Sequence, residues 1–379
     1  MIGRRTFLKL AVASAWASVL PTIPWSGLRG QATPESLDDM LEAIRTVHRV
    51  PALAAAFVRG RDLTGLGTVG TRRIDTPDRV QPQDRWHLGS CTKSMTATLV
   101  ALLVEQGKLS WQATVADVFP DLQGRIHQSY HRVTVLQFLL HRSGLPDDRQ
   151  GFTELYTWAQ SLAGPLPQRR RVVLERMLSR PPVSEPGSRY AYANFGFTIA
   201  GTFAEQATGQ AWEELIRQMV FQPLGMGTAG IGPPGLAQPW GHRSGVTCQP
   251  VAPGSGFDVP PPMNPAGAVH CSMGDWARYA ALHVQGAQRT SGLLLKPESF
   301  QRLHTDEFCQ GYALGWGVEE QDWAGGPVLR HSGSNGMWYA RIRVAPKREA
   351  AVLAATNCGG DLASRACEVA IERMISKYL

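Results

Sequence analysis

Segments with strand character lie at both ends of this chain, and segments with helical character fill its middle. Near the amino end, residues 51–58 form a short apolar run, and residues 63–69 can pair with it as a hairpin. Near the carboxyl end, three more strand-like segments precede a final helical pattern: residues 327–330, 338–344 and 350–356. The simplest assembly joins both ends in one mostly antiparallel sheet flanked by helices, with a mainly helical domain inserted. We therefore expect an α/β fold of the α+β type.

Helical patterns in the middle of the chain set the expected division into parts. A helix is expected to begin near Thr33, where a capping residue precedes proline and glutamate. Apolar residues then recur at helical spacing in residues 91–106, 135–140, 195–208 and 272–284. We expect an α/β part and a helical part with a cleft at their junction. The expected bounds are 33–85 and 290–379 for the first and 86–289 for the second.

The first 32 residues resemble an export signal rather than part of the fold. A twin arginine, Arg4 and Arg5, precedes an apolar run in residues 10–20, which is the pattern of a twin-arginine signal. The run is shorter than the roughly 20 residues that cross a bilayer, so no stable membrane span is expected after signal removal. These features predict a periplasmic or secreted protein. An uncleaved membrane anchor is the alternative, and the cleavage position is left open.

Charge and cysteine content argue against several other classes of protein. Four of the seven net positive charges lie in residues 1–33, and no basic stripe interleaved with aromatics follows, so no nucleic-acid partner is expected. The six cysteines include no CxxC pair, and no HExxH or EF-hand pattern occurs, so neither a metal site nor a cofactor is expected. The cysteines are interpreted as mostly buried thiols, with one disulfide formed after export as the alternative.

A serine and a lysine spaced for one helical face are the first candidates for chemistry. Ser90 and Lys93 stand three positions apart at the start of the helical pattern 91–106, in the only SxxK of the chain. Backbone N–H groups at a helix start favour developing negative charge near Ser90. A serine hydroxyl is a weak nucleophile until a base takes its proton, and burial lowers the pKa of a lysine toward that role.

A tyrosine and an asparagine form the second motif, Tyr192-Ala193-Asn194, which is the only YxN in the chain. A tyrosine held near an ammonium has its phenolate form favoured and can relay a proton. The Asn194 amide can donate to a substrate carbonyl or contact Lys93. The alternative interpretation is a core tyrosine beside a helix-capping asparagine.

The third motif, His331-Ser332-Gly333, follows a strand-like stretch. On a strand His331 and Gly333 share one side, and the missing side chain of Gly333 lets a substrate approach the strand edge. The backbone N–H groups of Ser334 and Ser90 are a candidate oxyanion hole. A second HxG, which begins at His87, lies just ahead of Ser90, and His87 and His141 are interpreted as structural.

The order of the three motifs, together with their flanking sequence, resembles the family of class C beta-lactamases, D,D-peptidases and related esterases. Tyr192 follows Ser90 by 102 residues, and His331 follows Tyr192 by 139. The resemblance covers about residues 36–375. Its other matching segments are residues 88–93, 105–109, 135–146, 186–191, 265–267, 311–317 and 356–357.

This resemblance implies a beta-lactamase/transpeptidase-like fold and a serine hydrolase that works through an acyl-enzyme. It makes Ser90 the nucleophile and gives proton transfer to Lys93 with Tyr192. Asn194 would orient the substrate or Lys93. His331 and Gly333 would line the substrate site, and the N–H groups of Ser90 and Ser334 would hold the oxyanion. The expected partner is a small-molecule ester, amide or peptide.

The residue at position 331 departs from the beta-lactamase pattern, which has a lysine there. An unperturbed histidine is mostly neutral at pH 7, so the fixed charge that attracts a substrate carboxylate is missing. The sequence therefore favours an esterase-like or amidase-like hydrolase. A beta-lactamase or D,D-peptidase acting on cell-wall-like substrates is the first alternative, and a non-catalytic binding module of the same fold is the second.

Overall fold

The computed structural model describes residues 36–379 except 150, 246 and 291. The predicted export signal and the expected helix start at Thr33 lie outside the described residues. The first described helix is α1 (Leu37–His48), whose cap is Ser36, because the Ser36 side chain accepts a hydrogen bond from the Asp39 backbone N–H.

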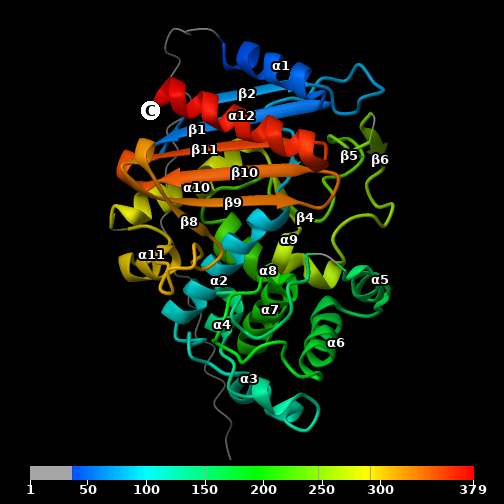
Figure 1. Cartoon of the computed structure of the whole chain (residues 1–379), viewed down its shortest axis with the longest axis vertical. Coiled ribbons are helices and arrows are strands. Elements are labelled where there is room, and N and C mark those ends of the chain that lie inside the picture. Colours follow the sequence, from blue (N-terminus) through cyan, green and yellow to red (C-terminus); the bar gives the residue numbers. More distant parts are fainter. Residues whose placement is uncertain (1–35, 150, 246, 291) are drawn as a thin grey trace, which may run out of the picture.

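A six-stranded antiparallel sheet is assembled from both ends of the chain (Figure 1). The strand order is β2-β1-β11-β10-β9-β8, and the two ends meet where Leu53 lies opposite Thr356 in the β1–β11 pair. This confirms the expected sheet and the α+β character of the fold. The strands are β1 (Ala52–Arg59), β2 (Asp62–Gly70), β8 (Gly317–Gln321), β9 (Gly326–Ser334), β10 (Tyr339–Ala345) and β11 (Ala350–Thr356).

Helices cover both faces of this sheet, as strand alternation requires. Leu53, Ala55 and Phe57 of β1 pack in one apolar cluster with α1 and α12 (Gly360–Tyr378). The alternate residues of β1 belong to the larger core, together with α10 (Met273–Ala287). Although α10 lies within the expected helical part, it contacts β1 and β11 of the sheet.

The helical part is built around α2 (Thr92–Glu105), in which every residue from Thr92 to Leu103 is buried. Because α2 is buried nearly all round, polar residues such as Lys93 and Thr96 are buried in it together with the apolar ones. The other helices are α3 (Val115–Val118), α4 (Val135–Leu139), α5 (Thr153–Ser161), α6 (Leu166–Leu178), α7 (Asn194–Thr208), α8 (Trp212–Ile216), α9 (Asn264–Gly267) and α11 (Pro297–His304). Short strands are β3 (Trp86–His87), β4 (Gly230–Ile231), β5 (Gly241–Arg243), β6 (Gln249–Val251) and β7 (Val269–Cys271).

A buried ion network ties the helical part together. Arg170 of α6 is fully buried and donates to the carboxylates of Glu205 and Glu213. Glu213 also accepts a hydrogen bond of 2.8 Å from Asn264, the first residue of α9. Because both acids are satisfied by one guanidinium, the network fixes α6, α7 and α9 relative to one another. Within the described part of the chain, no helix is long and apolar enough to cross a membrane.

Candidate active site

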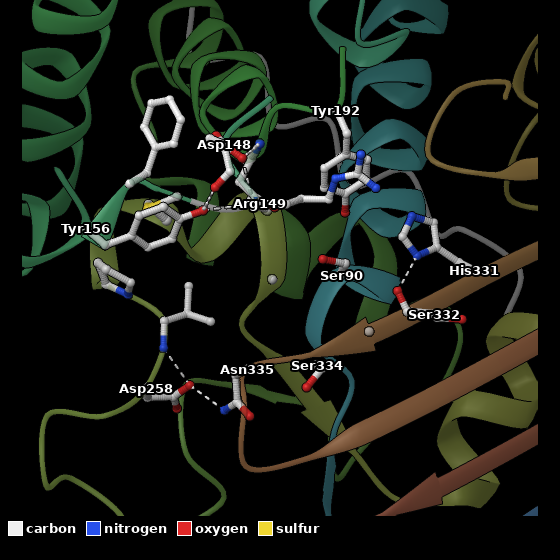
Figure 2. Close-up of a pocket in the computed structure, with 18 of the residues that line it drawn as sticks. Ser90, Asp148, Arg149, Tyr156, Tyr192, Asp258, His331, Ser332, Ser334 and Asn335 are labelled. Atoms are coloured by element: carbon white, nitrogen blue, oxygen red, sulfur yellow. Dashed lines mark hydrogen bonds between the residues drawn. The ribbon is translucent and has the colours of Figure 1, made fainter. Parts of the chain in front are cut away.

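A cleft of about 1280 Å³ opens between the helical part and β9 of the sheet. Figure 2 shows Ser90 between two walls, with Asp148 and Tyr156 on one side and His331 and Ser332 on the other. The candidate site residues that line this cleft are Ser90, Tyr192, Asn194, His331, Gly333 and Ser334.

Ser90 lies in a single 3-10 turn, η1 (Gly89–Cys91), which leads directly into α2. The turn packs against β9 so closely that only glycine fits at position 333. A Cβ atom on Gly333 would lie 1.9 Å from the Leu88 carbonyl oxygen and 2.6 Å from the Ser90 nitrogen. Gly89 has a φ of +50°, and a Cβ atom there would lie 2.4 Å from the Ser334 nitrogen. The backbone nitrogens of Ser90 and Ser334 therefore lie on two segments in direct contact.

Lys93 extends from the first turn of α2 and is fully buried. Its Nζ lies 3.1 Å from Ser90 Oγ, 2.6 Å from Asn194 Oδ1 and 2.7 Å from the Ala266 carbonyl oxygen. Burial lowers the pKa of Lys93 to about 7, and the negative charge of Asp148 opposes that shift. A base with a pKa near neutrality thus touches the candidate nucleophile.

Tyr192 lies on the loop before α7, with its ring against the Lys93 ammonium at 4.9 Å from Nζ to the ring centroid. Burial raises the pKa of Tyr192 well above its usual range, and a hydrogen bond with Ser90 opposes this by less. The phenol therefore stays protonated near pH 7. The sequence argument expects a nearby ammonium to favour the phenolate, and burial acts in the opposite direction.

Asn194, the first residue of α7, directs its amide oxygen toward Lys93. Both of its amide hydrogens are used elsewhere, by Asp148 Oδ1 and by Tyr156 Oη, each at 2.8 Å. Of the two contacts that the sequence left open for Asn194, the structure contains the one with Lys93.

His331 is buried at the edge of β9 and carries no charge near neutrality. Burial lowers the pKa of His331 to about 3, and the charge of Lys93 adds to the effect. Its Nδ1 lies 2.7 Å from the Ser332 carbonyl oxygen, so Nδ1 carries the proton and the other ring nitrogen is an acceptor. Arg330 also lines the cleft, is exposed and pairs with Glu319 at 2.6 Å.

Two residues hold the YxN loop in place: His141, which was interpreted from the sequence as structural, and Asp148, which sequence reasoning missed. His141 accepts a hydrogen bond of 3.0 Å from the Ala193 N–H, and its ring packs on Tyr192 at 4.4 Å between centroids. Burial lowers the pKa of His141 well below its usual range. Asp148, seven residues later, binds the start of α7. The only available signal was their position around the Ser143–Pro146 stretch.

A second missed cluster forms the wall beyond Ser334. Asp258 Oδ1 accepts hydrogen bonds of 2.8 Å from Asn335 Nδ2 and 2.7 Å from the Val259 N–H, and it lies 3.3 Å from His87 Nε2 (Figure 2). Burial tends to raise the pKa of Asp258, but His87 and Asn335 outweigh it and hold that pKa well below its usual range. These contacts tie the loop before η5 (Pro261–Met263) to the turn after β9.

A family model described as Beta-lactamase matches residues 37–369. Penicillin-binding protein 4 of Amycolatopsis lactamdurans is 27% identical over 335 residues, which cover 85% of this chain and 84% of that protein. A beta-lactamase of Escherichia coli (strain K12) is 23% identical, with 80% and 76% covered. An unguisins hydrolase of Aspergillus campestris is 24% identical, and the match covers 81% of this chain but only 58% of that protein.

Solved structures share the fold over most of its length. An octameric penicillin-binding protein homologue from Pyrococcus abyssi has a TM-score of 0.72 at 22% identity, covering 90% of this chain and 77% of that one. The D-alanine carboxypeptidase AmpC from Burkholderia cenocepacia has a TM-score of 0.68 at 18% identity, covering 90% and 97%. At such identities these likenesses establish a beta-lactamase/transpeptidase-like fold.

Proposed function

Because the chain belongs to the beta-lactamase family of serine hydrolases, we propose that it forms an acyl-enzyme on Ser90 with ester or amide substrates. The observation that carries this proposal is the 3.1 Å contact between Lys93 Nζ and Ser90 Oγ inside the cleft. A pKa of about 7 for Lys93 leaves much of it neutral at neutral pH, so it can take the Ser90 proton.

The proposed acylation proceeds in two steps. Lys93 takes the Ser90 proton while Oγ bonds to the substrate carbonyl carbon, and the N–H groups of Ser90 and Ser334 stabilise the resulting oxyanion. The intermediate then collapses, the bond to the leaving oxygen or nitrogen breaks, and the leaving group takes the proton that Lys93 holds, either directly or through Tyr192, which passes on its hydroxyl proton and is reprotonated by Lys93. Water releases the acyl group by the same steps, with Lys93 accepting a water proton.

His331 supports a substrate without an obligatory carboxylate. Its pKa of about 3 leaves it neutral, and its Nδ1 proton is already directed to the Ser332 carbonyl oxygen. The remaining nitrogen accepts rather than donates, so it would favour a substrate N–H or hydroxyl over an anionic oxygen. This reasoning makes simple esters and amides the first class to assay.

A beta-lactamase or D,D-peptidase activity is the second candidate. The relatives named as penicillin-binding protein, beta-lactamase and D-alanine carboxypeptidase favour it. Turnover of nitrocefin or covalent capture of a fluorescent penicillin would support it, and absence of both would contradict it. The proximity of Lys93 to Ser90 Oγ argues against a non-catalytic module.

Labelling by a fluorophosphonate tests the proposed nucleophile directly. We expect the wild-type protein to be labelled and the Ser90→Ala variant to stay unlabelled. Ser94→Ala is a matched control from the same helix, because its hydroxyl donates to the Cys91 carbonyl oxygen and contacts Tyr279, and it should label like wild type. Equal labelling of wild type and Ser90→Ala would contradict the proposal.

We also propose that the protein is exported through the twin-arginine pattern of residues 4–20. The expected result is recovery of the chain in the periplasm or medium, and its retention in the cytoplasm when both Arg4 and Arg5 are replaced by lysine. Unchanged export of that double variant would contradict the proposed route.

A further inference from the structure

Asp148 is a buried carboxylate in the lining of the cleft. The proposed reaction assigns no role to it. Its Oδ1 accepts from the Asn194 backbone N–H at 2.8 Å, and its Oδ2 accepts from the Phe195 N–H at 2.9 Å. Its own backbone N–H donates to the Tyr192 carbonyl oxygen at 3.2 Å. Asp148 therefore fixes the YxN segment by three hydrogen bonds. Its carboxylate caps the amino end of α7, although it comes from a distant part of the sequence.

The same carboxylate also decides which way the Asn194 side chain points. Asn194 Nδ2 donates to Asp148 Oδ1 and to Tyr156 Oη, and Tyr156 Oη in turn donates to the Asp148 backbone carbonyl at 3.4 Å. The opposite orientation would set the amide oxygen against a carboxylate. Two acceptors thus hold both amide hydrogens, and the oxygen is left to face Lys93 at 2.6 Å.

The orientation of that amide determines whether Lys93 can act as a base. A neutral amine has two N–H groups and one lone pair. With the Asn194 oxygen and the Ala266 carbonyl accepting the two N–H groups, the lone pair is left for the Ser90 hydroxyl. With the amide reversed, Asn194 Nδ2 would donate to Lys93 and occupy the lone pair that Ser90 needs.

We propose that Asp148 is a positioning residue for catalysis: with Tyr156 it orients the Asn194 amide so that the Lys93 lone pair faces Ser90. The inference rests on the proposed function, because it assigns a role within the same proton transfer. Asp148 hydrogen-bonds to Asn194, and its proposed role is exerted through Asn194 and Lys93.

The charge of Asp148 adds a second, separable effect on Lys93. The titratable groups that act on Lys93 or are acted on by it are Cys91, His141, Asp148, Tyr192 and His331. Of these only Asp148 is a carboxyl group, and its charge raises the pKa of Lys93 against the effect of burial. Burial raises the pKa of Asp148 itself, opposed by the N–H donors of Asn194 and Phe195. Removing this charge should lower the pKa of Lys93 further.

The test measures the second-order rate constant of fluorophosphonate labelling against pH, between about pH 5 and pH 9. The variants are Asp148→Asn, which removes the charge and can donate to Asn194, and Tyr156→Phe, which removes one acceptor but keeps the charge. Asp147→Asn is the matched control, because Asp147 is exposed and binds Arg149. Thermal unfolding is followed for every variant.

For Asp148→Asn we expect the plateau rate to fall about 10-fold or more and the acid-side midpoint to move down by about one pH unit. For Tyr156→Phe we expect a plateau several-fold lower with an unmoved midpoint, and for Asp147→Asn we expect wild-type values. A wild-type plateau rate in Asp148→Asn would overturn the proposal, and so would a loss of rate that thermal unfolding accounts for as a smaller folded fraction. An unmoved midpoint would refute the charge effect alone. If Asp148→Asn fails to fold, an unchanged plateau in Tyr156→Phe overturns the proposal. Failure of the wild-type protein to label would refute the proposed function instead.

Discussion

Replacing Gly333 with alanine should damage catalysis far more than it damages folding. A Cβ atom there would lie 1.9 Å from the Leu88 carbonyl oxygen and 2.6 Å from the Ser90 nitrogen, where real contacts stay at 3.0 Å or more. Both neighbours are backbone atoms, so β9 must retreat from η1 by about 1 Å. That movement separates the Ser334 N–H from the Ser90 N–H, and a misplacement of this size costs roughly 100-fold in rate when it falls on an oxyanion hole.

The assay compares the fluorophosphonate labelling rate and the thermal midpoint of Gly333→Ala with those of Gly124→Ala. Gly124 has open space around its added Cβ and no left-handed backbone, so its variant should match wild type. We expect Gly333→Ala to stay folded and to label about 100-fold more slowly. A labelling rate within twofold of wild type would refute the idea that close packing of β9 on η1 forms the oxyanion hole.

Three further predictions concern other parts of the molecule. The labelling rate should rise with pH through about 7 and then level off, because Lys93 must lose its proton before it can take that of Ser90. The Lys93→Met variant should lose this pH-dependent rate, and a flat profile in the wild-type protein would contradict the prediction. In urea unfolding, Arg170→Ala should lose about 3–5 kcal/mol, since two acids are left without their buried partner. Arg171 is only half-buried and pairs with an exposed acid, so Arg171→Ala should lose less than about 1 kcal/mol, and equal losses would refute the prediction. The His331→Lys variant restores a fixed positive charge, so the ratio of penicillin turnover to p-nitrophenyl acetate turnover should rise about 10-fold. An unchanged ratio would show that the charge at position 331 does not select the substrate.

The elements of the sheet were predictable from sequence because their patterns are local. The apolar runs at 51–58 and 350–356 became β1 and β11, and the final helical pattern became α12. β8 was not predicted, because Gly317–Gln321 is mostly polar and has no alternation. It is an edge strand that pairs with β9 and is bridged to Tyr312 at Gly317, and such tertiary pairing is not indicated by composition.

Some contacts in the site also follow from local spacing in the sequence, and others form only in the tertiary fold. Ser90 and Lys93 lie on one turn of helix, so their contact follows from spacing alone. Asp148 and Asn194 lie 46 residues apart, and no pattern in the sequence indicates that a carboxylate from one loop caps the helix that begins at the other. Their contact requires the tertiary fold, which is why the sequence left the orientation of Asn194 open.

The burial of α2 links the fold to the chemistry. An amphipathic α2 would expose one face, and a lysine on that face would keep a pKa near 10.5, too high for a base at neutral pH. Here α2 packs against α7, α8, α9 and α11 and its first turn is buried, so Lys93 loses its water and its pKa falls to about 7. The lost hydration is replaced by three oxygens, from Ser90, from Asn194 and from Ala266. These oxygens come from segments that are distant in sequence, so the fold itself, rather than any one motif, makes a lysine into a base.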